Sequence, residues 1–279
     1  DKMDIKLIAT DVDGTLVGAD HMVIPKVNIE AMNMAKEKGI INVISTGRSL
    51  SLAAGEIEKL GCIDYAVISN GAAVVDLKDN SVMTSCYLDK EKVEEIVNIF
   101  NKYPLVYEIY ADKKGFISQY TYDNFRKCSL PNEFMDYYKT KMEMYDDPMD
   151  VVRNTNVEKF NVDYTPEECI EDLYKDLEKV TDIVITAGFK GNVEITAVGA
   201  DKGKALKFLC DEIGVDMKNV MAFGDSGNDV TMLTEAEESY AMVSGNELAK
   251  EAAKHVTKLS NEDGGVGETI KEYLTNTEK

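Results

Sequence analysis

Apolar and polar residues alternate along the first part of the chain in a way that predicts strands separated by helices. The apolar run at residues 5–10, bounded by Gly14, predicts a buried strand. Pro25 and Gly39 favour the start and the end of a helix between them. Its helical spacing predicts one apolar stripe, formed by Val27, Ala31, Met34 and Lys38. Further strands at 40–44 and 65–68, with a helix between them, indicate a right-handed parallel sheet.

The pattern changes after residue 72, where a β-hairpin at 72–88 is predicted, with its turn at 78–80. Between about 84 and 190, helices at 90–103 and 166–180 mix with short β segments. Alternating strands and helices resume after Asn192, with a helix at 202–213 and strands at 219–223, 240–243 and 256–257. The prediction is an α/β fold with a Rossmann-like parallel-sheet core, formed by residues 1–83 and 191–279, and an inserted α+β domain at 84–190.

The inserted region contains most of the tyrosines of the chain, from Tyr87 to Tyr174. They are expected to form much of the core of the small domain. Some could instead line a pocket, because an amphipathic ring with a hydroxyl group suits a polar organic ligand.

Asp11 and Asp13 directly follow the first predicted strand. In an open α/β sheet, ligands bind at the carboxyl ends of such strands. A turn at Gly14 can bring both carboxylates to one small volume, where they resist joint ionisation unless a cation or a proton lies between them. The pattern therefore predicts a metal site or an acid pair that shares a proton. A surface turn is an alternative, and a calcium loop is disfavoured because Met22 stands where its bidentate Glu is needed.

Three predicted strands end in polar residues of complementary kinds. Asp11 and Asp13 end the first strand, Thr46 and Gly47 the second, and Asp225, Asn228 and Asp229 the last. In a parallel sheet these ends lie along one edge, and oxygen ligands suit Mg²⁺ rather than zinc. The hydroxyl of Thr46 and the charge of Lys202 at a helix start add donors for a phosphoryl group, so the set predicts phosphoryl transfer. Taken singly, the same residues also fit helix caps or a solvated helix face.

Composition narrows the choice of partners. The formal net charge is −20, with 51 Asp and Glu against 31 Lys and Arg. This field disfavours nucleic acid and anionic membranes as partners, and it means that a phosphate site needs its own local cations. Five scattered cysteines without a CxxC pair favour free thiols over a disulfide framework or a zinc site. With no predicted leader or membrane span, the expectation is a cytoplasmic protein whose oligomeric state is open.

The chain resembles the haloacid dehalogenase superfamily, and within it the Cof-type (subfamily IIB) phosphatases with a large α/β cap. The four motifs occur in order: Asp11-Val-Asp-Gly-Thr-Leu16, Ser45-Thr-Gly-Arg48, Lys202 and Gly224-Asp-Ser-Gly-Asn-Asp229. Ser69-Asn-Gly-Ala72 and Ser260-Asn-Glu-Asp-Gly264 also resemble subfamily signatures. The loop 241–246 departs from the family pattern, so the role of Asn246 is left open.

The resemblance implies a role for each matching residue. Asp11 would attack phosphorus and become an aspartyl-phosphate, and Asp13 would act as acid and base. Mg²⁺ would be held by Asp11, the backbone carbonyl of Asp13 and Asp225, with Asp229 ordering its waters or Lys202. The phosphoryl group would be bound by Thr46, Gly47, Lys202 and Asn228. The inserted domain would be the cap that selects the substrate.

Three functions compete on this reading. The first is a Mg²⁺-dependent phosphatase acting on a small phosphomonoester, such as a sugar phosphate or a similar metabolite. The second is a phosphomutase related to the phosphomannomutases, which passes the phosphoryl group to a sugar instead of water. The third is a non-catalytic protein that binds a phosphometabolite, which would not need Asp13 as an acid and base.

Overall fold

The protein is described by a computed structural model that covers residues 4–277 and divides into two compact units. The first unit contains residues up to 47, residues 53–85 and residues from 201 onward. The second contains residues 48–52 and 86–200. The second unit thus extends past the boundary expected at residue 190. The reason is β11 (Val193–Ala197), which pairs antiparallel with β9 and β10 and does not join the parallel sheet.

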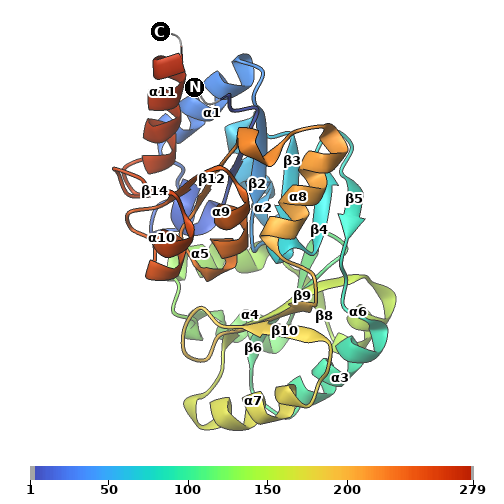
Figure 1. Ribbon diagram of the computed structural model, residues 1–279. Helices are drawn as coiled ribbons and strands as arrows, with labels where there is room; N and C mark the ends of the chain where they lie inside the picture. Colours follow the sequence, from blue (N-terminus) through green and yellow to red (C-terminus); the bar gives the residue numbers. More distant parts are fainter. Residues whose placement is uncertain (1–3, 278–279) are drawn as a thin grey trace. The chain divides into compact units, whose positions relative to one another are not determined.

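The first unit contains an eight-stranded sheet in the order β14-β13-β12-β1-β2-β3-β4-β5 (Figure 1). Its strands are β1 (Leu7–Thr10), β2 (Ile41–Ser45), β3 (Tyr65–Ile68), β4 (Ala73–Asp76), β5 (Ser81–Ser85), β12 (Val220–Gly224), β13 (Glu238–Ala241) and β14 (His255–Val256). Strands from β14 to β3 run parallel, and β4 and β5 form an antiparallel extension. Thr10 lies opposite both Phe223 and Ile44, so β12, β1 and β2 end side by side. The predicted α/β fold is confirmed.

Helices cover both faces of this sheet because the side chains of β1 alternate in direction. Ile8 packs in a cluster with α1 (Lys26–Glu37) and α11 (Gly265–Thr277), whereas Leu7 and Ala9 pack with α8 (Lys202–Ile213) and α9 (Val230–Glu235). The helices α1 and α11 come from opposite ends of the sequence and lie against each other (Figure 1). The remaining helices outside the inserted region are α2 (Leu50–Leu60) and α10 (Glu247–Ala252).

Helix α1 buries a different stripe from the predicted one. Its buried residues are Asn28, Ala31, Met32 and Ala35, whereas Met34 is 38% exposed. Asn28 can face inward because its side-chain amide donates to the carbonyl of Leu16 at 3.0 Å and accepts from the backbone N–H of Gly267 at 2.7 Å. A buried polar group with both hydrogen bonds made does not oppose burial, so the apolar pattern alone points to the wrong face.

The second unit contains a six-stranded sheet in the order β10-β11-β9-β6-β7-β8, antiparallel except between β7 and β8. Its other elements are α3 (Lys90–Phe100), β6 (Val106–Ala111), β7 (Lys114–Ser118), α4 (Gln119–Asn124), α5 (Asn132–Tyr138), β8 (Glu143–Tyr145), α6 (Pro148–Asn154), β9 (Val157–Tyr164), α7 (Ile170–Glu178) and β10 (Ile183–Thr186). An apolar cluster joins α3, α6 and α7 to alternate residues of the sheet, including Ile109 and Phe160. Polar residues lie between them, including Glu108, Lys159 and Asn161.

All five cysteines lie within residues 4–277 and have free thiols, as predicted. Across the same residues, every helix is too short or too polar to traverse a bilayer.

Candidate active site

The turn after β1 presents the first carboxylate of the site. Asp11 is 4% exposed, and its own side chain accepts the N–H of Val12 at 2.7 Å, which caps the short helical turn η1 (Val12–Leu16). Gly14 has a φ of 73°, and a Cβ at this position would overlap the carboxylate of Asp225. Only glycine combines this left-handed backbone with so close an approach, so Gly14 lets the turn fold against the loop after β12.

That loop is ordered by Asp229, which is completely buried. One carboxylate oxygen of Asp229 accepts the N–H of Asp225 at 2.9 Å and that of Ser226 at 3.3 Å. Ser226 and Asp229 form a capping box at the start of the turn η7 (Gly227–Asp229), which runs into α9. Asp229 can therefore cap this turn and also take part in the site, because its second carboxylate oxygen is left to contact another residue.

That partner is Lys202, the first residue of α8. Its ammonium group lies 2.7 Å from Asp229 Oδ1 and 3.3 Å from Asp11 Oδ1, and the side chain is 0% exposed. The helix start is set by Asp201, whose carboxylate accepts the N–H of Lys204 at 2.7 Å. Burial alone would lower the pKa of Lys202, but the charges of Asp11 and Asp229 outweigh burial and raise that pKa. Lys202 is therefore a fixed cation within the site.

Negative charge still exceeds positive charge around Lys202. One carboxylate oxygen each from Asp11, Asp225 and Asp229 lies within 4.8 Å of the others. Burial, followed by the charge of Asp229, raises the pKa of Asp11 well above its ordinary value and that of Asp225 to about 7. Three carboxylates against one ammonium group form an oxygen-rich site that a divalent cation would neutralise. The donor set therefore fits Mg²⁺, with Asp11 and Asp225 available to hold it.

The carboxylate of Asp13 lies apart from this cluster. Its side chain is 34% exposed, and its Oδ1 lies 2.9 Å from Nδ1 of His21. The backbone of Asp13 still belongs to the turn that carries Asp11. The two aspartates are thus separated in environment: Asp11 is enclosed with Lys202, and Asp13 faces the more open side.

The other residues expected to bind a phosphoryl group, besides Lys202, lie in the loop after β2 and in the loop after β12. Thr46 is completely buried just beyond the end of β2. Its N–H donates to the carbonyl of Val67 at 2.8 Å, and its own carbonyl accepts the N–H of Asn70 at 3.0 Å. Gly47 follows Thr46 in the chain. The amide of Asn228 donates to Asn70 Oδ1 at 3.1 Å, which connects the loop after β12 to the turn after β3.

Sequence reasoning left three contributors unassigned. The hydroxyl of Thr15 donates to the carboxylate of Asp225 at 3.2 Å. The side-chain oxygen of Asn70 accepts a hydrogen bond from Asn228, and the imidazole of His21 contacts Asp13. Thr15 lies within the motif at residues 11–16 and Asn70 within the motif at 69–72, so membership of a motif was the available signal. Asn246, whose role was open, caps α10 by accepting the N–H of Ala249 at 3.0 Å.

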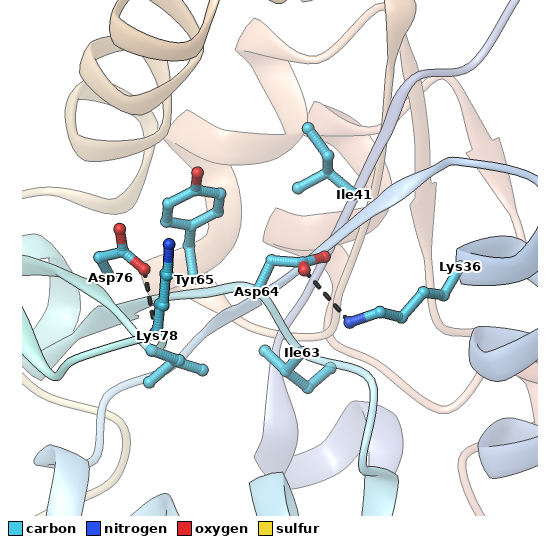
Figure 2. Close-up of a pocket in the computed structure, with 8 residues that line it drawn as sticks. Lys36, Ile41, Ile63, Asp64, Tyr65, Asp76 and Lys78 are labelled. Atoms are coloured by element: carbon cyan, nitrogen blue, oxygen red, sulfur yellow. Dashed lines mark hydrogen bonds and ion pairs between the residues drawn. The ribbon is translucent and has the colours of Figure 1, made fainter.

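A separate cavity of about 410 Å³ opens at the opposite end of the strands (Figure 2). Ile41 and Tyr65, which begin β2 and β3, line it together with Lys36, Ile63, Asp64, Asp76, Leu77 and Lys78. Its carboxylates are engaged within the protein: Asp64 pairs with Lys36 at 3.3 Å, and Asp76 accepts the N–H of Lys78 at 3.0 Å. None of the predicted site residues lines this cavity.

The sequence model of the haloacid dehalogenase-like hydrolases matches residues 8–270. The chain is 29% identical over 272 residues to the 5-amino-6-(5-phospho-D-ribitylamino)uracil phosphatase YcsE of Bacillus subtilis, covering 98% of this chain and 97% of that one. It is 31% identical to the putative phosphatase YxeH of the same organism, covering 93% and 95%.

Solved structures agree with these sequence matches. A haloacid dehalogenase-like hydrolase from B. subtilis superposes with a TM-score of 0.81 at 26% identity, covering 96% of this chain and 99% of the other. The matches in sequence and in fold both extend over nearly the full described chain, so they include the inserted unit as well as the parallel sheet.

Proposed function

The chain belongs to the haloacid dehalogenase-like hydrolases and is a phosphatase, and from this premise we propose that it hydrolyses small organic phosphomonoesters through an aspartyl-phosphate on Asp11. Sugar phosphates and similar phosphorylated metabolites are the proposed substrates. The observation that carries the proposal is the enclosed group in which Lys202 lies 3.3 Å from Asp11, and Asp225 lies beside Asp11. A buried nucleophile with a fixed cation at its side suits attack on an anionic phosphoryl group.

In the first step, a carboxylate oxygen of Asp11 forms a bond to phosphorus while the bond from phosphorus to the ester oxygen breaks. Asp13 gives its proton to the departing alkoxide, so an alcohol leaves. In the second step, water attacks the phosphorus, its proton returns to Asp13, and the bond from phosphorus to Asp11 breaks. Inorganic phosphate leaves and both carboxyl groups recover their starting states.

The other residues hold the phosphoryl group and the site in place. Lys202, the hydroxyl of Thr46, and the loop residues Gly47 and Asn228 are proposed to bind the equatorial oxygens. Mg²⁺, held by Asp11, Asp225 and the backbone carbonyl of Asp13, would supply positive charge for the phosphoryl oxygens when bound. Asp229 is proposed to position these groups without contacting the substrate. One of its oxygens accepts a hydrogen bond from Lys202, and the other accepts the N–H of Asp225.

The test is release of inorganic phosphate from a panel of phosphorylated sugars, polyols and nucleotides with added Mg²⁺. We expect turnover that chelation with EDTA abolishes and that Asp11→Asn reduces at least about a thousandfold, as expected for loss of a nucleophile. Asp79→Asn makes the same chemical change in the exposed turn between β4 and β5 and should leave turnover unchanged. Retained activity in Asp11→Asn would overturn the covalent route, and conversion of hexose 1-phosphate to hexose 6-phosphate without free phosphate would indicate a mutase.

A further inference from the structure

We propose that His21 is a positioning residue that orients the carboxylate of Asp13 toward the leaving group, and that Asn261 and Glu262 brace the loop that carries it. This inference rests on the proposed function, in which Asp13 protonates the departing alcohol. It assigns a role to the motif at 260–264, which the phosphoryl-transfer site does not use.

The contact itself is direct. Nδ1 of His21 lies 2.9 Å from Oδ1 of Asp13, and the side chains are 21% and 34% exposed. A carboxyl oxygen accepts hydrogen bonds whether or not the group carries its proton, so the imidazole tautomer with a hydrogen on Nδ1 donates to Asp13. Holding one oxygen restricts rotation of the carboxyl group, and a general acid depends on such orientation because proton transfer needs a short, aligned path.

The loop between η1 and α1 is shaped to present His21. His21 has a φ of 61°, a left-handed conformation that costs a non-glycine residue about 1 kcal/mol. The conformation is stabilised by local hydrogen bonds: Asp20 accepts the N–H groups of Met22 and Val23 at 2.9 and 3.0 Å, and His21 donates its own N–H to Gly18 at 3.0 Å. The backbone therefore holds the imidazole on the side of Asp13 at a conformational cost.

A second segment, far away in sequence, holds the base of this loop. The side-chain amide of Asn261 donates to the carbonyl of Val17 at 3.0 Å, and the N–H of Ala19 donates to the carboxylate of Glu262. A Cβ at Gly18 would lie 2.7 Å from Glu262 Oε1, so the carboxylate of Glu262 comes close to the backbone of this loop. Both contacts secure the residues that come just before His21.

The experiment measures kcat/KM for a series of aryl phosphates whose leaving phenols differ in acidity. A poor leaving group needs protonation by Asp13, whereas an acidic phenol leaves with little help. For His21→Ala we expect kcat/KM to fall about tenfold or more with phenyl phosphate and less than about threefold with p-nitrophenyl phosphate, a fraction of the usual effect of general acid catalysis. The dependence on leaving-group acidity therefore becomes steeper.

Two further variants separate the side chain from the backbone, and a third is a control at the other histidine. His21→Asn retains a short amide and tolerates the left-handed backbone, so it should recover much of the phenyl phosphate activity. His21→Gly relieves the backbone without restoring a side chain, so it should behave like His21→Ala even if the alanine variant folds poorly. His255→Ala removes the other histidine, which is 48% exposed and contacts Glu238, and should leave the series unchanged.

The brace is tested in the same series. Glu262→Ala should steepen the leaving-group dependence in the same direction as His21→Ala and by a smaller factor, whereas Glu251→Ala, at an exposed position of α10, should not. An equal loss for every leaving group, or no loss in His21→Ala and His21→Gly, would overturn the positioning role. Failure of the proposed function has a different signature, since wild type would then show no turnover or Asp11→Asn would remain active.

Discussion

Lys202 offers the most direct test of the electrostatics of the site. The Lys202→Met variant keeps an unbranched side chain, one atom shorter, and removes its charge. Lys202 is 0% exposed and lies 2.7 Å from Asp229 and 3.3 Å from Asp11. Breaking a buried ion pair by removing one partner costs about 3–5 kcal/mol, which is a large part of the ~5–15 kcal/mol that stabilises a typical domain.

The size of this loss should depend on pH. The pKa of Asp11 is already raised, and Lys202 is one of the groups that hold it down. A carboxyl group with a raised pKa in the folded state binds more protons there than in the unfolded chain, so the free energy of unfolding falls as pH rises between the two pKa values. Without Lys202 this fall continues to higher pH. The variant should therefore be closer to wild type at pH 5 than at pH 8.

Hydrogen exchange by mass spectrometry, with EDTA present, gives a local measurement. It suits this chain because the two units have separate apolar clusters and no tryptophan reports on either. Peptides from β1 and β12 should exchange at least about a hundredfold faster in Lys202→Met at pH 8, whereas peptides from β9 provide an internal reference. Lys204→Met, whose side chain is 71% exposed, should change stability by less than about 0.5 kcal/mol.

Lys202→Met leaves the carboxylates of Asp11 and Asp229 without their cation. Adding Asp229→Asn removes one of these two charges and should recover about 1–3 kcal/mol of the loss. Exchange of β1 and β12 within threefold of wild type at pH 8, or a deficit that is the same at pH 5, would contradict the assigned ion pair.

Three other predictions concern the backbone, the second unit and α1. Gly14→Ala should lose activity at least tenfold and destabilise by about 1–3 kcal/mol, measured by phosphate release and thermal denaturation, whereas Gly39→Ala, with a φ of 83° and open space around it, should keep full activity. Burial and then the charge of Glu108 raise the pKa of Asp163, so the free energy of unfolding of wild type should fall as pH rises from 5 to 8. Asp163→Asn should make this fall smaller, measured by hydrogen exchange of β9, and an unchanged dependence on pH would contradict it. Asn28→Ala should cost about 1–3 kcal/mol in chemical denaturation because two buried backbone groups lose their partner, against less than about 0.5 kcal/mol for the exposed Met34→Ala.

Much of the site could be expected from sequence because its residues follow strands. Strand ends in a parallel sheet share an edge, and β12, β1 and β2 are neighbours, so Asp11, Thr46 and Asp225 reach the same edge. Lys202 was expected beside them because it starts a helix. These inferences rest on local signals, namely apolar runs, glycine turns and helix starts, which a single stretch of sequence contains.

Other features were decided only when distant segments met. The inward face of α1 depends on Gly267, the place of β11 depends on its pairing with β9, and Asp229 caps a turn while it binds Lys202. The position of His21 was also decided by a distant segment, because the loop that carries it is held by Glu262. By itself the sequence determined the strand-end chemistry and the α/β class. The tertiary structure alone decided which polar groups are buried as pairs, because a hydrogen bond between residues far apart in the chain leaves no periodic signal in either segment.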